Sequence, residues 1–74
     1  MRTYKVKGRI FCKRDIGIYR SYGIVARDES GKRIWEIPDI GLEKEAVMDL
    51  CDRMNQGQPE DVHIMDIIDD FLAE

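Results

Sequence analysis

The sequence is poor in the residues that build metal centres and proton-transfer sites. It contains one histidine, His63, and two cysteines, Cys12 and Cys51, which lie far apart in the chain. A zinc site needs three or four thiolate or imidazole ligands, usually at short spacings, and this set does not supply them. We therefore expect no metal and no other cofactor. We expect Cys12 and Cys51 to face each other in the core as small apolar side chains.

Long apolar runs are also absent. No stretch approaches the ~18 residues that a membrane-spanning helix needs, and the chain opens on alternating polar residues rather than on an apolar export signal. We therefore expect no membrane partner, a cytoplasmic location and reduced thiols. The 74 residues are expected to fold as a single domain, 1–74, whose thin core favours support from a second subunit.

The sequence lacks a catalytic constellation as well. An activated nucleophile needs a base beside it, and His63, near the start of a predicted helix, is more typical of a solvated residue. Neighbouring carboxylates such as Asp69 and Asp70 point about 100° apart on a helix and do not share a site. The glycines are isolated turn residues and form no phosphate-binding loop. We expect neither an enzyme nor a small-molecule substrate.

What the sequence does have is a charge split between its two halves. Residues 1–37 hold ten Lys or Arg and four Asp or Glu, a net charge of +6, whereas residues 38–74 hold two and eleven, a net charge of −9. Such asymmetry indicates either a polar partner surface or two halves that attract each other.

The basic half alternates with the period of β-strands. Residues 3–13 and 18–27 each place apolar side chains on one face, and Asp28-Glu29-Ser30-Gly31 is a turn in which Gly31 supplies a positive φ. Residues 32–37 form the third predicted strand, which we expect Pro38 to end because proline cannot donate to a ladder. Gly23 inside the second strand predicts a bulge or a close backbone approach.

The acidic half has the period of helices. The apolar positions of the first predicted helix are Ala46, Val47, Leu50, Cys51 and Met54, and those of the second are Ile64, Ile67, Ile68, Phe71 and Leu72. Gly57 is expected to end the first helix as a left-handed cap. The predicted fold is α+β, with a three-stranded antiparallel meander and two C-terminal helices packed on one face (β-β-β-α-α).

Four short motifs occur in a suggestive order: Tyr22-Gly23-Ile24, Asp28-Glu29-Ser30-Gly31, Glu36-Ile37-Pro38-Asp39-Ile40 and Asp69-Asp70-Phe71-Leu72. In this order the chain, from about Tyr19 to Leu72, resembles a family of short bacterial proteins, best known from spore-forming anaerobes and catalogued only as a domain of unknown function. The resemblance implies a compact intracellular bacterial domain, and it implies no activity.

Two charged surfaces suggest different partners. Lys5, Lys7, Arg9 and Lys13 alternate on one strand face around Phe11, which is compatible with a nucleic-acid backbone. The pI of about 5.1 and the acidic helices oppose that reading, and a solvated sheet face with guarded edges is the preferred interpretation. We therefore do not expect nucleic acid as a partner.

These observations favour a non-enzymatic intracellular interaction module that binds a protein, including a second copy of itself as a homodimer. The expected interface anchors are the large aromatics Phe11, Tyr19 and Trp35. The alternative is an acidic mimic of nucleic acid that inhibits a nucleic-acid-binding enzyme, as some phage anti-defence proteins do. In this alternative the carboxylates that imitate phosphates are those of Asp66, Asp69 and Asp70 on the second predicted helix.

Overall fold

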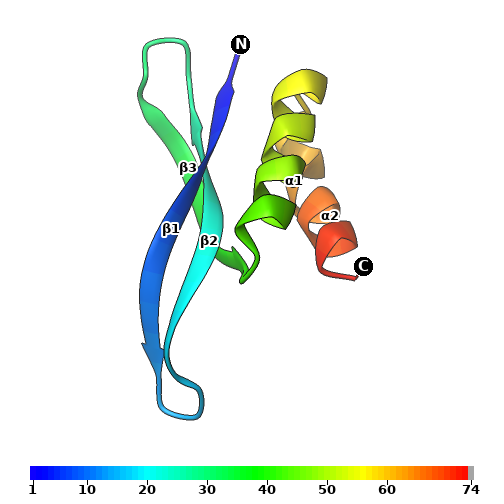
Figure 1. Cartoon of the computed structure of the whole chain (residues 1–74). Helices are drawn as coiled ribbons and strands as arrows, with labels where there is room; N and C mark the ends of the chain where they lie inside the picture. The colour runs from blue at the N-terminus through cyan, green and yellow to red at the C-terminus, as the bar shows by residue number, and fades with distance from the viewer. Residues whose placement is uncertain (74) are drawn as a thin grey trace.

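The predicted architecture is confirmed. A computed structural model describes residues 1–73, and its elements in chain order are β1 (Thr3–Lys13), β2 (Gly17–Arg27), β3 (Arg33–Gly41), α1 (Lys44–Gly57) and α2 (Asp61–Leu72). The strands form one antiparallel sheet in the order β1-β2-β3, and both helices lie on the same side of it (Figure 1). Within residues 1–73 neither helix has the length and apolar character needed to cross a membrane.

Two turns hold the meander in register. β1 pairs with β2 from Thr3 opposite Arg27 to Lys13 opposite Gly17, and Gly17 ends this hairpin with a φ of +90°. In the second turn, Gly31 has a φ of +87°, as its sequence position predicted. The Asp28 carboxylate accepts hydrogen bonds from the Ser30 hydroxyl at 2.6 Å and from the Lys32 N–H at 3.0 Å, and these bonds lower the pKa of Asp28.

Pro38 does not end the third strand, contrary to the sequence prediction. β3 continues to Gly41, and its pairing jumps from Ile37 opposite Ile24 to Gly41 opposite Tyr22, which leaves extra residues on β3 as a bulge. Proline is tolerated at a bulge of an edge strand, and Asp39 absorbs the distortion with a φ of +59°.

The core lies between the sheet and the helices. Tyr4, Ile24, Ala26 and Ile40 come from the sheet side, Val47, Leu50, Cys51 and Met54 from α1, and Ile64 and Ile68 from α2. These helical positions belong to the predicted apolar stripes and are spaced by three and four residues, so that one face of each helix packs in the core. Leu72, also predicted for the second stripe, is instead 58% exposed.

The end of α1 is built by Gln58 and not, as predicted, by Gly57. Gln58 takes the left-handed conformation, with a φ of +46°, and its N–H donates to the Met54 carbonyl at 2.8 Å. Its side-chain amide exchanges two hydrogen bonds of 2.8 Å with the backbone N–H and C=O of Arg2. These tertiary bonds offset the strain of a non-glycine residue in this conformation.

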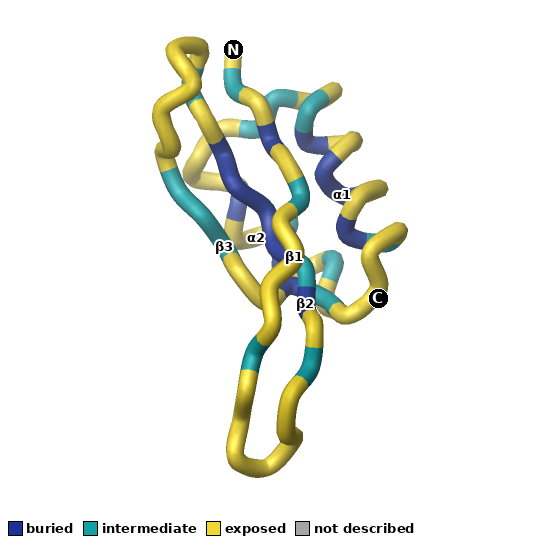
Figure 2. The backbone as a smooth tube through the Cα atoms, turned by 60° about the vertical axis from the view of Figure 1, so that its left-hand side comes forward, coloured by how far each residue is buried: buried dark blue, intermediate teal, exposed yellow. Residues whose placement is uncertain are grey.

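The helix layer is shorter than the sheet that it covers. α1 has 14 residues and so spans about 21 Å, whereas the 11 residues of β1 span about 36 Å. The far half of the β1–β2 hairpin therefore projects beyond the helices, and Figure 2 shows most of its residues as exposed. The radius of gyration is accordingly 12.7 Å, against roughly 11 Å for a compact chain of this length.

Gly23 and Gly57 form a matched pair for testing the bulge. A Cβ on Gly23 would lie 2.3 Å from the Ile37 carbonyl oxygen, whereas one on Gly57 would meet nothing within 4 Å. We predict that Gly23→Ala lowers the free energy of unfolding by about 2 kcal/mol or more, and that Gly57→Ala raises it by about 0.5–1 kcal/mol. Equilibrium urea denaturation measures both; equal stability of the two variants would contradict the bulge geometry.

Candidate functional site: the projecting hairpin and the groove beside it

The projecting hairpin, defined here as residues 9–20, carries exposed apolar side chains on its helix side. In the register of the sheet, Ile10 pairs with Arg20, and Cys12 pairs with Ile18, on the face that would continue the core. Ile10 is 65% exposed and Ile18 is 78% exposed, because the helices end before they reach this part of the sheet. Ile16, in the turn between them, is also exposed. We call Ile10, Cys12, Ile16 and Ile18 the apolar tip.

The prediction that Cys12 and Cys51 face each other in the core is wrong, because the helices do not reach the part of the sheet that carries Cys12. Cys51 is buried in the core, but Cys12 is exposed, and both are free. The alternating pattern of β1 correctly predicted that Cys12 lies on the helix side of the sheet. The helices are too short to cover this part of that face, so Cys12 is exposed. Burial raises the pKa of the Cys51 thiol, and the neighbouring Asp52 carboxylate adds to the effect.

The two predicted anchors Phe11 and Tyr19 meet on the opposite face of the hairpin. Their rings stack with centroids 5.5 Å apart and an interplanar angle of 22°. The Tyr19 hydroxyl donates to Asp39 at 2.8 Å, and the Lys13 ammonium lies 5.9 Å from the centroid of the Tyr19 ring. The aromatic pair is therefore linked to the β3 bulge through the hydroxyl of Tyr19.

The third predicted anchor, Trp35, lies elsewhere. Its ring is half-buried against the core, with its centroid 5.8 Å from that of Tyr4, and its Nε1–H donates to Asp61 at 3.3 Å. Trp35 thus contributes to the packing of α2 on the sheet and is not part of the hairpin surface.

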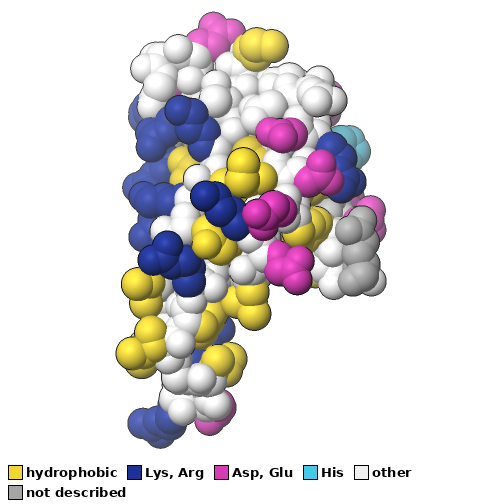
Figure 3. Space-filling view, in the orientation of Figure 1, with side chains coloured by type: hydrophobic (Ala, Val, Ile, Leu, Met, Phe, Trp, Pro, Cys, Tyr) yellow, Lys and Arg dark blue, Asp and Glu magenta, His cyan; other side chains and the backbone are white. Residues whose placement is uncertain are grey.

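Charge is separated between the two layers of the molecule. Asp66, Asp69 and Asp70 are exposed on α2, and within residues 1–73 none of them forms an ion pair. In Figure 3 basic side chains line the sheet side on the left, and acidic side chains lie over the helix layer. The basic half of the sequence therefore forms a basic sheet surface, and the acidic half forms an acidic helix surface.

The basic sheet face is partly neutralised by its own strands. Glu36 pairs with Arg9 at 2.6 Å and with Arg33 at 2.9 Å, and Asp39 pairs with Lys13 at 3.5 Å. Exposed pairs of this kind contribute little stability, at most about 1 kcal/mol each. They do remove positive charge that a polyanion would need.

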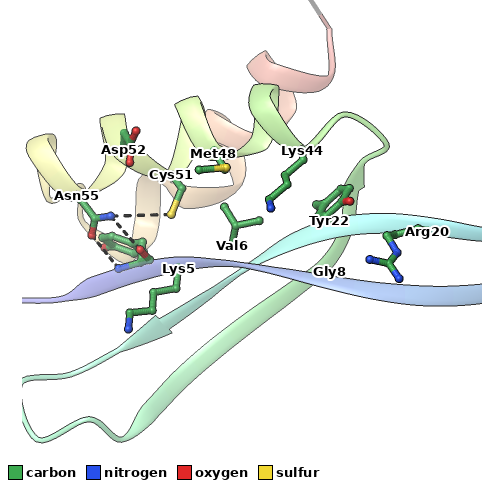
Figure 4. A pocket seen from close by; sticks show the side chains of 11 residues that line it. Lys5, Val6, Gly8, Arg20, Tyr22, Lys44, Met48, Cys51, Asp52 and Asn55 are labelled. Carbon is green, nitrogen blue, oxygen red and sulfur yellow. Dashed lines mark hydrogen bonds between the residues drawn. The ribbon is translucent and has the colours of Figure 1, made fainter.

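A groove of about 530 Å³ between β1 and α1 was missed by the sequence reasoning. Figure 4 shows Val6 and Tyr22 on the sheet side and Met48, Cys51 and Lys44 on the helix side. Gly8, Lys5, Arg20, Asp52, Asn55 and Tyr4 complete its lining. The only available signal was the single face of α1 on which Lys44, Met48, Cys51 and Asn55 recur at helical spacing, and this stripe resembles ordinary core packing.

The described residues 1–73 contain no group of three or more His, Cys, Asp or Glu side chains placed to hold a metal ion. Cys12 is at the projecting end, Cys51 is in the core, and His63 is exposed on α2.

No protein-family model matches the chain, and no curated protein or solved structure matches it either. The resemblance to the family of short bacterial proteins stays a prediction, and the functional argument depends on the geometry of the hairpin and the groove.

The two cysteines test the projection directly. We predict that a small thiol reagent modifies one thiol of the native protein rapidly, at Cys12. It should reach Cys51 much more slowly, because Cys51 is 4% exposed and burial raises its pKa, which lowers the share of the reactive thiolate. Stopped-flow labelling with mass spectrometry identifies the site. The Cys12→Ser variant should lose the rapid phase, and similar rates for both thiols would contradict the description of the hairpin.

Proposed function

We propose that this chain is a non-enzymatic protein-interaction module that self-associates through the apolar tip of its projecting hairpin. The observation that carries the proposal is the exposure of Ile10 and Ile18 on a sheet face that elsewhere forms the core. Clustered, exposed apolar side chains are typical of binding surfaces.

A second copy fits this face better than it fits the opposite one. Two hairpins packed tip to tip on their helix sides keep Arg9 and Lys13 of each copy on the outer faces, where like charges do not meet. Arg20, which pairs with Ile10 on the packed face, also lines the groove.

The size of the tip limits the affinity. Burial of one isoleucine contributes roughly 1.5–3 kcal/mol, so Ile10 and Ile18 from two copies supply about 6–12 kcal/mol before the costs of association. Those costs are at least about 4 kcal/mol. We therefore propose a reversible homodimer no tighter than about micromolar.

We also propose a cytoplasmic location. An exposed and unpaired thiol such as Cys12 stays reduced in that compartment.

Ile18 and Val62 provide a matched test, since both are branched aliphatic residues with similar exposure, 78% and 73%. We predict that the wild-type mass rises from 8.7 kDa towards twice that value as concentration increases. Ile18→Glu should weaken the dimer by about tenfold or more, because it removes two buried side chains. Val62→Glu on α2 should leave the dimer unchanged.

Sedimentation equilibrium at micromolar to millimolar concentration makes the measurement. A wild-type mass of 8.7 kDa throughout would contradict self-association, and equal effects of the two variants would contradict the assignment to the apolar tip.

A second candidate function is the acidic mimic that inhibits a nucleic-acid-binding enzyme. Its support is the exposed set Asp66, Asp69 and Asp70, whose charge is not neutralised by an ion pair within residues 1–73. This candidate requires a salt-sensitive complex with a basic protein. Such a complex should survive Ile18→Glu and be lost when the three aspartates are changed to asparagine.

A further inference from the structure

The outer edge of β1 is covered at one end by the side chains of Asn55 in α1 and of Gln58, the residue that follows α1. The Asn55 side-chain amide accepts a hydrogen bond from the Tyr4 N–H at 2.8 Å and donates one to the Tyr4 carbonyl at 2.9 Å. Gln58 makes the same pair of bonds with Arg2, at 2.8 Å each. Two amides thus take the place of a neighbouring strand at alternate residues.

The remainder of this edge is open. In an antiparallel ladder the residues that face the partner strand alternate with residues that face away. Because the backbone groups of Tyr4 face away from β2, those of Val6, Gly8, Ile10 and Cys12 do so too. Within residues 1–73 no hydrogen bond reaches these outward groups. Each of the four residues therefore offers an unpaired N–H and C=O along one line.

The groove runs beside this open edge. Its floor is Val6 with the Tyr22 ring, which lies against Gly8, and its wall is the face of α1 that carries Met48 (Figure 4). Met48 is 43% exposed, so an apolar side chain entering the groove would find apolar contacts on both sides. An open edge flanked by a helix is the arrangement in which domains accept an added β-strand.

The charges around the groove are mostly positive. Arg20 and Lys44 contribute to its lining, against the single acid Asp52, and Lys5 lines it from β1 with its side chain directed away from α1 (Figure 4). Within residues 1–73 none of these three bases is in an ion pair. Lys7 and Arg9 follow Lys5 on the sheet face away from the helices, where every second side chain of an added strand would also point.

We propose that the β1 edge from Val6 to Cys12 binds an extended segment of another protein as a fourth strand, with alternating apolar and acidic side chains. The apolar side chains enter the groove beside Met48, and the acidic ones lie beside Lys5 and Lys7. Backbone hydrogen bonds supply the docking, and the alternation supplies the specificity. This site uses the edge of the sheet and is separate from the apolar tip that we propose for self-association.

A second copy of β1 is disfavoured at this edge when the two strands pair about Gly8. Antiparallel pairing of two β1 strands about Gly8 would place Lys7 opposite Arg9 of the other copy and repeat this contact by symmetry. Like charges directly across a ladder are destabilising. Lys7, which disfavours a second copy in this register, is also one of the two lysines that attract an acidic strand.

The test uses a labelled synthetic peptide that alternates valine and glutamate, and a control peptide with the same residues arranged as a valine block and a glutamate block. Binding is measured by fluorescence anisotropy at protein concentrations where the chain is monomeric. We expect the alternating peptide to bind about tenfold or more tightly than the block peptide, with affinity that falls as salt rises. Equal binding of the two peptides would mean simple charge attraction and would overturn the proposal.

Two variants locate the site. Ile10→Pro removes an outward N–H, whereas Ile10→Thr keeps it and preserves strand propensity; we expect the first to weaken binding about tenfold relative to the second. Lys7→Glu should weaken binding by a similar factor without loss of melting temperature. Undiminished binding by Ile10→Pro would overturn the edge assignment.

Amide hydrogen exchange followed by NMR separates the remaining outcomes. Bound peptide should protect Val6, Gly8, Ile10 and Cys12, which are the outward residues of β1. Protection of these amides in free protein that increases with concentration would identify a second copy as the occupant, and perturbation of α2 alone would place the peptide elsewhere. Either result would overturn the proposal.

Discussion

The mismatch in length between the helix layer and the sheet is the constraint on which this structure depends. About 21 Å of α1 lies along about 36 Å of β1, and the core forms only where the two overlap. On the part of this sheet face beyond the overlap, Ile10 and Ile18 are left 65% and 78% exposed. The apolar alternation of the hairpin nevertheless continues to its end, so the far half displays on its surface the pattern that the near half buries.

The same constraint divides the edge of β1. Near the N-terminus, α1 lies close enough for Asn55 and Gln58 to occupy the backbone groups of Tyr4 and Arg2. Farther along, the helix side chains are Met48 and Lys44, which leave a groove in place of hydrogen bonds. The basic side chains of β1 then favour an acidic strand at the open edge, because they attract its carboxylates and repel the basic side chains of a second copy of β1. The N-terminal part of β1 is thus held by hydrogen bonds to Asn55 and Gln58, and the rest of the same strand is the edge that we propose for binding.

Local pattern was sufficient to predict the elements, their order and the faces of each strand and helix, since period two and period 3.6 leave a clear signal in a short chain. It failed where tertiary contacts override local preference. Pro38 is accommodated by a bulge, and Gln58 takes the left-handed cap because its amide binds Arg2. Exposure of Cys12 depends on where α1 ends in space, and the groove depends on two elements far apart in sequence. Neither is visible in periodicity.

Residue-resolved hydrogen exchange along β1 tests the central claim most directly. The amides of Lys5, Lys7 and Phe11 all face β2 in the same ladder, so differences among them report the cover provided by the helices rather than the presence of a hydrogen bond. In dilute, monomeric protein we predict that Lys5 and Lys7 exchange only through global unfolding, and that Phe11 exchanges much faster through local opening of the hairpin. Equal protection of Lys7 and Phe11 would contradict the account, because it would mean that the projecting half is as firmly held as the half beneath the helices.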